Sequence, residues 1–208
     1  VCDAKIGMLG YGSMGRYSAY LEHLSVKQNI GPEIEQLDQY VLIKKLEEMQ
    51  DSAVAADVTK APKDWEVADA VEEKDLCTTF KMYQTLKSLI GEYDWSALTI
   101  KCQYELSKFY KNVPCVPLSM LGNELPCSCE ADIPLITTQL MMYYLSGGET
   151  VTYCDIHDIT EKSIVTVPWD EAGPHLRFST TFYVEDEAGE DKLYAELLSR
   201  LSEVKFTF

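Results

Sequence analysis

Apolar segments of strand length alternate with amphipathic helical segments along the first three-quarters of the chain, and this order limits the possible folds. Residues 5–9 form a short apolar run followed by glycines. Residues 67–90 carry apolar side chains at helical spacing, and residues 133–145 do so again between Asp132, a plausible N-cap, and two glycines. Such alternation favours parallel strands. We therefore expect an α/β fold, a Rossmann-like, mostly parallel sheet with flanking helices.

The periodicity also predicts limits for each element. Strands or extended segments are expected at residues 5–9, 33–37, 97–102, 113–118 and 151–154. Helices are expected at residues 16–28, 40–49, 67–90, 104–110 and 133–145, with Gly91 as a C-cap. Residues 51–65 are polar with little periodicity and are expected to form a loop.

The pattern changes after Asp155. Strand-like segments follow at residues 163–167, 176–184 and 204–208, with one helical segment at 192–201. We therefore expect two domains: a Rossmann-like α/β domain over residues 1–150, and the start of a β-rich C-terminal domain over residues 151–208. Because the first residue is Val1, we also expect the chain to be part of a longer protein.

Charge and cysteine content limit the possible partners and the compartment. The chain has 34 acidic and 18 basic residues, giving a formal net charge of −16. Such a surface repels nucleic acids and anionic membranes, and no apolar run approaches the roughly 20 residues that span a bilayer. Seven cysteines, an odd number without a secretory signal before them, fit reduced thiols in the cytoplasm.

A glycine pattern follows the first expected strand. Gly10, Gly12 and Gly15 have the spacing of a dinucleotide-binding turn, in which glycines let the backbone approach a pyrophosphate. An acidic residue should follow about 20 positions later to bind the ribose, and Asp38 is near that place. The same glycines also make tight turns in α/β folds without cofactors. An NAD(P)-dependent oxidoreductase is therefore an alternative function.

Two acidic residues flank the expected helix at 133–145. Glu130 stands just before this helix, and Asp155 directly follows the expected strand at 151–154. In an open parallel sheet both positions would lie at the carboxyl edge, where ligands bind. Two carboxylates there can hold a divalent cation or act as an acid–base pair. The structural alternative is that Glu130 interacts with its own helix terminus and Asp155 starts a turn.

Residues around these two acids form motifs similar to those of a known enzyme family. The motifs are Lys101-Cys102, Pro114-Cys115 with Ser119, Cys129-Glu130 with Asp132, Leu145-Ser146-Gly147 and Cys154-Asp155. In this order they resemble the L-fucose isomerase-like family of sugar isomerases. The resemblance is close over residues 97–158 and looser over the first 96 residues.

The resemblance implies a metal-dependent aldose–ketose isomerase that works through an ene-diol. It implies that Glu130 and Asp155 bind Mn²⁺ (or another divalent cation) and transfer the proton, and that the protein forms a homo-oligomer acting on a small sugar. Family members take a third ligand from a downstream histidine. His157 and His175 follow Glu130 here, but both fit surface positions better. We therefore expect the third ligand outside this chain, and a non-catalytic sugar-binding relative is a further alternative.

Overall fold

The computed structural model describes residues 1–12, 19–64, 67, 71–151, 154–159, 164–168 and 180–181. The chain divides into two compact units. The first contains the described residues up to Val151, and the second contains those from Cys154 onward. Each unit is described by itself.

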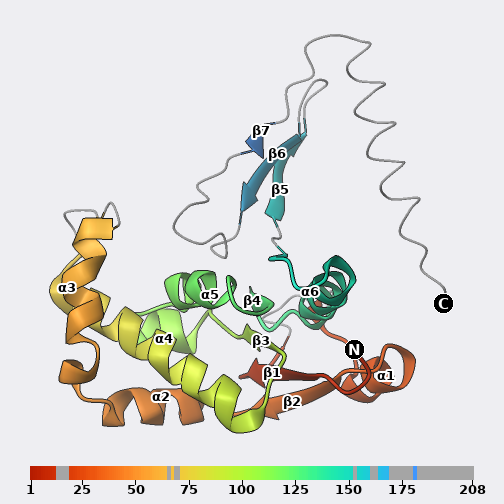
Figure 1. Cartoon of the computed structure of the whole chain (residues 1–208), viewed down its shortest axis with the longest axis horizontal. Coiled ribbons are helices and arrows are strands. Elements are labelled where there is room, and N and C mark those ends of the chain that lie inside the picture. Colours follow the sequence, from red (N-terminus) through yellow and green to blue (C-terminus); the bar gives the residue numbers. More distant parts are fainter. Residues whose placement is uncertain are drawn as a thin grey trace. The chain divides into compact units, whose positions relative to one another are not determined.

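The first unit is built around a parallel sheet of four strands, ordered β2-β1-β3-β4 (Figure 1). The strands are β1 (Lys5–Leu9), β2 (Glu33–Leu37), β3 (Ala97–Ile100) and β4 (Cys127–Cys129). All three neighbouring pairs run parallel. The predicted α/β fold with a parallel sheet is confirmed, and β1 and β2 have the predicted limits.

The strand order creates a reversal between β1 and β3. From β1 the chain continues to β2 on one side, and then passes back to β3 on the other side of β1. The connections after β1 and β3 therefore leave the sheet in opposite directions. In open α/β sheets, the carboxyl ends of two such strands are the usual position of a ligand site.

Helices cover both faces of this sheet. α1 and α6 lie on one face, and α2, α4 and α5 lie on the other (Figure 1). The helices are α1 (His23–Asn29), α2 (Gln39–Glu48), α3 (Ala55–Asp64), α4 (Glu73–Tyr93), α5 (Cys115–Leu121) and α6 (Ile133–Ser146). A 3-10 turn at Asp51–Ala53 precedes α3, and a π-helical segment at Glu105–Tyr110 follows β3.

Alternate residues of β1 contribute to the cores on the two faces. Ile6 and Met8 belong to the same core cluster as Val26 of α1 and Ile136 of α6. On the opposite face, Gly7 lies against the Trp95 ring, which a Cβ at that position would overlap. A parallel strand covered on both faces needs an apolar run, as the sequence of β1 has.

α6 follows its predicted limits because strong signals mark both ends. Asp132 is the N-cap and accepts a hydrogen bond from the Leu135 amide at 2.9 Å. Gly147 has a φ of 80°, the left-handed conformation of a C-cap glycine. At α4, in contrast, the predicted C-cap Gly91 is wrong. The helix continues to Tyr93, and Asp94 with a φ of 56° caps it.

Several expected elements differ from the structure. The expected loop at residues 51–65 contains α3, because Val54, Val58 and Ala61 form an apolar stripe that packs against Phe80 of α4. The expected extended segment at 113–118 is mostly α5, and β4 was not predicted. Of the expected helix at 16–28, residues 23–28 are helical and residues 20–22 are not, while residues 16–18 lie outside the described part of the chain.

The second unit contains an antiparallel sheet ordered β5-β6-β7. Its strands are β5 (Cys154–Ile159), β6 (Ile164–Pro168) and β7 (Thr180–Thr181). The expected strand at 204–208 and helix at 192–201 lie outside the described residues. Among the helices that the structure describes, none combines the length and the apolar character needed to cross a bilayer.

Candidate active site at the carboxyl edge of the sheet

Glu130 directly follows β4 and is held there in an unusual backbone conformation. Its φ is 63°, and the φ of Ala131 is 51°, so two consecutive non-glycine residues are left-handed. The Ala131 amide donates to the Ile100 carbonyl at 3.1 Å, which ties this turn to the end of β3. Such residues cost about 1–3 kcal/mol each and concentrate at functional sites. The turn is therefore the first indication of a site.

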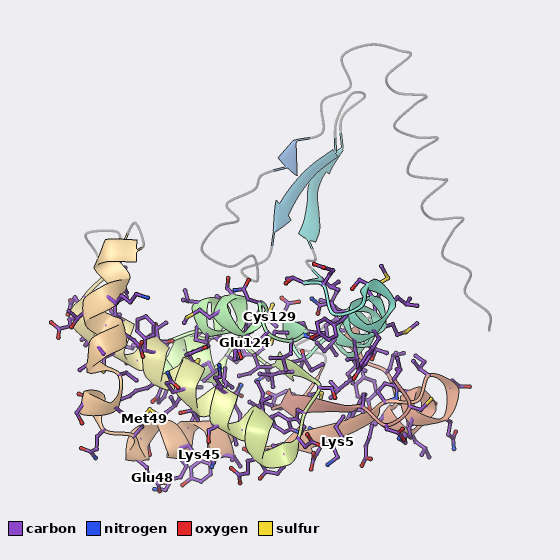
Figure 2. All side chains as sticks on the ribbon, in the orientation of Figure 1. Lys5, Lys45, Glu48, Met49, Glu124 and Cys129 are labelled. Carbon is purple, nitrogen blue, oxygen red and sulfur yellow. The ribbon has the colours of Figure 1, made fainter. Side chains whose placement is uncertain are left out.

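The side chain of Glu130 is only 7% exposed. The Gln103 side-chain amide donates a hydrogen bond to Glu130 Oε1 at 3.3 Å. Gln103 belongs to the segment that follows β3, so residues after two neighbouring strands meet at this carboxylate. A buried carboxylate at the carboxyl edge can act as a general base or as an oxygen ligand for a hard cation. Figure 2 labels Cys129, the β4 residue that precedes it.

Lys101, the residue after β3, carries a fully buried ammonium group. Its side chain is 0% exposed and forms an ion pair with Glu105. Lys101 Nζ also lies 4.0 Å from the centroid of the Tyr11 ring and 5.2 Å from that of the Tyr104 ring. A buried charge needs such partners to offset its lost hydration. We call this group the lysine cluster; it consists of Lys101, Glu105, Tyr11 and Tyr104.

The glycine turn after β1 fits closely against the lysine cluster. Gly10 has a φ of 97°, and a Cβ there would lie 2.9 Å from Lys101 Cβ. A Cβ on Gly12 would lie 3.6 Å from the Ala131 carbonyl oxygen. Gln36 Nε2 donates to the Gly10 carbonyl at 2.8 Å and fixes the start of the turn. The segments after β1, β3 and β4 therefore converge at one edge.

The close approach of Lys101 provides an explanation for Gly10 that needs no cofactor, since Gly10 makes room for Lys101. Asp38, the expected ribose ligand, is the N-cap of α2 and accepts a hydrogen bond from the Tyr40 amide at 2.8 Å. Gly15 lies outside the described residues.

The position expected for Asp155 was wrong. It lies within β5, paired with Val167 in the antiparallel sheet, and does not follow a strand of the parallel sheet. The side chain of Asp155 is outside the described part of the chain, so its role as a partner of Glu130 stays a prediction. The register of β5 shifts between Ile156 and Asp158, which places His157 at the irregularity. His175 lies outside the described residues.

Glu130 matches the oxygen chemistry of the predicted Mn²⁺ site as one ligand. Across the described residues, no group of three or more His, Cys, Asp and Glu side chains is placed to hold a metal ion. The neighbouring Asp132 carboxylate caps α6. Cys127 and Cys129 are buried in β4. Besides Glu130, the predicted metal site would therefore need ligands from side chains outside the described part of the chain, such as that of Asp155.

Sequence reasoning selected Glu130 but not the lysine cluster. A usable signal was present, because Lys101 directly follows an apolar strand and Glu105 stands four residues later. The roles of Tyr11 and Tyr104 depend on contacts between distant segments, which periodicity does not reveal.

Comparison with protein-family models gives no match for this chain, and comparison with curated proteins gives none either. A function for this protein must therefore be inferred from the chemistry of the site, because one fold supports many functions.

Proposed function

We propose that the protein is a carbohydrate isomerase that interconverts an aldose and a ketose through an ene-diol. The observation that carries this proposal is Glu130, a buried carboxylate held in a left-handed turn at the carboxyl edge of a parallel sheet. The resemblance of residues 97–158 to the L-fucose isomerase-like family supports the same assignment. We further propose a cytoplasmic homo-oligomer that acts on a small sugar, without a nucleic acid or membrane partner.

In this reaction Glu130 removes the proton from one sugar carbon and returns it to the neighbouring carbon. The Gln103 amide orients the carboxylate through its hydrogen bond to Oε1. A divalent cation, when bound, polarises the sugar oxygens and makes the carbon-bound proton more acidic. Glu130 and Asp155 are the proposed ligands, with Mn²⁺ as the expected cation.

The isomerase is favoured over the NAD(P)-dependent oxidoreductase for a specific reason. A nicotinamide cofactor needs both the Gly10 turn and an acidic residue for its ribose. Gly10 is in contact with Lys101, and the Asp38 carboxylate caps α2. Both features therefore already have structural roles.

The first test is Mn²⁺ binding by calorimetry to the wild-type chain, to Glu130→Gln and to Asp155→Asn. We expect each substitution to weaken binding at least tenfold, because residues that merely orient a metal ligand already have effects of roughly that size. Glu33→Gln is the matched control, since Glu33 is exposed at the start of β2, on the opposite edge. It should bind Mn²⁺ like the wild type.

The second readout is sugar isomerisation in D₂O with Mn²⁺ present. An ene-diol route places solvent deuterium on the carbon that receives the proton. We expect Glu130→Gln to lower the rate by about 10²-fold or more, the usual contribution of a general base. Equal Mn²⁺ binding by the wild-type chain and Glu130→Gln, or an isomerisation rate that Glu130→Gln leaves unchanged, would refute the proposal.

A further inference from the structure

Two exposed tyrosine rings are fixed on a single buried ammonium group. Tyr11 is 54% exposed and Tyr104 is 41% exposed, although both rings contact Lys101 Nζ. The ammonium cannot follow a moving ring into solvent without breaking its ion pair with Glu105. These exposed aromatic groups are therefore held in place, which lowers the entropy lost when a ligand binds them.

Glu105 adds a polar group beside the Tyr11 ring. Its side chain is 41% exposed and accepts a hydrogen bond from the Tyr11 hydroxyl at 3.3 Å. Tyr104 is constrained further, because the Lys108 ammonium lies 5.1 Å from its ring centroid. Tyr104 also has a φ of 64° and a ψ of −87°, a conformation that non-glycine residues rarely adopt. Tyr11 is thus the more open of the two rings that contact the Lys101 ammonium.

This arrangement lies next to Glu130. Gly12, which follows Tyr11, is close to the carbonyl oxygen of Ala131, and Gln103, which precedes Tyr104, donates to Glu130. The rings therefore stand at the carboxyl ends of β1 and β3, where the strand order reverses. A ligand that reaches Glu130 at this edge has these two rings and the Glu105 carboxylate beside it.

We propose that Tyr11, Tyr104 and Glu105 form a binding platform for the polyhydroxylated carbon chain of the substrate, a role that rests on the proposed isomerase function. The C–H groups of a sugar pack on the face of an aromatic ring, and its hydroxyl groups donate to a carboxylate and to phenol oxygens. Lys101 is the positioning residue: it holds the rings and the carboxylate without reaching the ligand.

The test measures binding of alditols, which have the polyol chain of a sugar but no carbonyl group to isomerise. Ribitol, D-arabinitol and D-mannitol are titrated by saturation-transfer NMR in EDTA, so that metal binding does not contribute. We expect Tyr11→Ala to raise Kd roughly three- to tenfold, the value of one aromatic contact, and Tyr11→Phe to stay within about twofold.

The matched control is Tyr40→Ala, which removes an exposed tyrosine at the start of α2. It should leave the alditol Kd unchanged. Thermal unfolding of each variant confirms that it is folded. Because Tyr11 is exposed, Tyr11→Ala is expected to fold, and Tyr11→Phe restores the ring without the hydroxyl group.

The outcomes separate this platform from the isomerase proposal. Loss of alditol binding in Tyr11→Ala, together with Mn²⁺ binding and an isomerisation rate that Glu130→Gln leaves unchanged, would support the platform and reject the isomerase. Unchanged alditol binding in Tyr11→Ala, together with Mn²⁺ binding that depends on Glu130, would reject the platform and retain the isomerase. A wild-type chain that binds none of the three alditols also rejects the platform.

Discussion

The amino-terminal ends and the carboxyl-terminal ends of the parallel strands, here called the amino edge and the carboxyl edge of the sheet, are built from different kinds of interaction. Figure 2 labels a residue at each, Lys5 at the start of β1 and Cys129 at the end of β4. Before β3, the Trp95 ring packs on Gly7 and its Nε1 donates to Glu35 at 2.9 Å. After the strands, the chain instead contains a buried ammonium group and consecutive left-handed residues.

This difference separates residues that stabilise the fold from residues that provide chemistry. Apolar burial before β3 is favourable for folding, whereas the buried charge of Lys101 and the backbone at Glu130 cost free energy. Natural proteins accept such costs mainly at functional sites. Substitutions at the amino edge should therefore change stability alone, and those at the carboxyl edge should change ligand binding.

The largest effect on stability is expected from Trp95→Ala. Trp95 is 5% exposed and stacks on Tyr93 with ring centroids 5.2 Å apart. Removing the ring leaves a cavity over Gly7, which should lower the free energy of unfolding by about 3–5 kcal/mol. Urea denaturation measures this loss, and alditol binding by the folded variant should stay unchanged. A loss below about 1 kcal/mol would show that this packing is not a major source of stability.

Substitutions in the ion pair between Lys101 and Glu105 should lower the free energy of unfolding less than Trp95→Ala does, and by unequal amounts for the two partners. Glu105→Gln leaves the buried Lys101 ammonium without its countercharge. Because the Tyr11 ring still stabilises this ammonium in part, the free energy of unfolding should fall by about 2 kcal/mol. Lys101→Met should cost less than about 1 kcal/mol, because the half-exposed Glu105 can be hydrated by water.

Urea denaturation of the two single variants and the double variant measures the coupling within this pair. Equal losses in the single variants would contradict the burial of Lys101. The same variants sharpen the functional comparison, because Lys101→Met should weaken alditol binding while stability stays nearly unchanged.

The sequence was sufficient to predict elements whose signals are local. β1 and β2 are apolar or alternating runs between turn residues, and α6 has both a polar N-cap and a glycine C-cap. α3 was missed because Pro62 and several charged residues mask a stripe of only three small apolar side chains, whose burial depends on Phe80 of α4. α5 was missed because Pro114 and Pro117 favour an extended segment, yet both fit in or before its first turn.

The site was predictable only in part for the same reason. Glu130 could be selected because it precedes a well-marked helix and belongs to a recognisable motif. The lysine cluster depends on Gly10 and Lys101 approaching each other across two strands that are far apart in the sequence. No local pattern contains that information, and the glycine spacing instead indicated a dinucleotide turn.

The smallest change in the free energy of unfolding is expected at the solvent-exposed ion pair between Lys87 and Glu124, which serves as a reference for the pair of the buried Lys101 with Glu105. Lys87 Nζ of α4 lies 2.6 Å from Glu124 Oε1, and both side chains are about half exposed. The hydrogen bond from Lys87 lowers the pKa of Glu124 below its ordinary 4.5, and the same bond raises the pKa of Lys87 above its ordinary 10.5. Solvent screening limits the contribution of such a pair to about 0.2–1 kcal/mol.

The pH dependence follows from the directions of these two shifts. A lowered carboxyl pKa gives stability that is complete above pH 4.5 and is lost as the pH falls through the folded-state value. A raised lysine pKa gives stability that is complete below pH 10.5 and is lost as the pH rises through the folded-state value. Lys87→Met should therefore lower the free energy of unfolding by about 0.2–1 kcal/mol near pH 7. The loss should be smaller in strong acid, where Glu124 is protonated. Urea denaturation near pH 7 and in strong acid measures these losses of unfolding free energy. A loss at pH 7 as large as that caused by Glu105→Gln would mean that burial of Lys101 does not distinguish its ion pair from the exposed one.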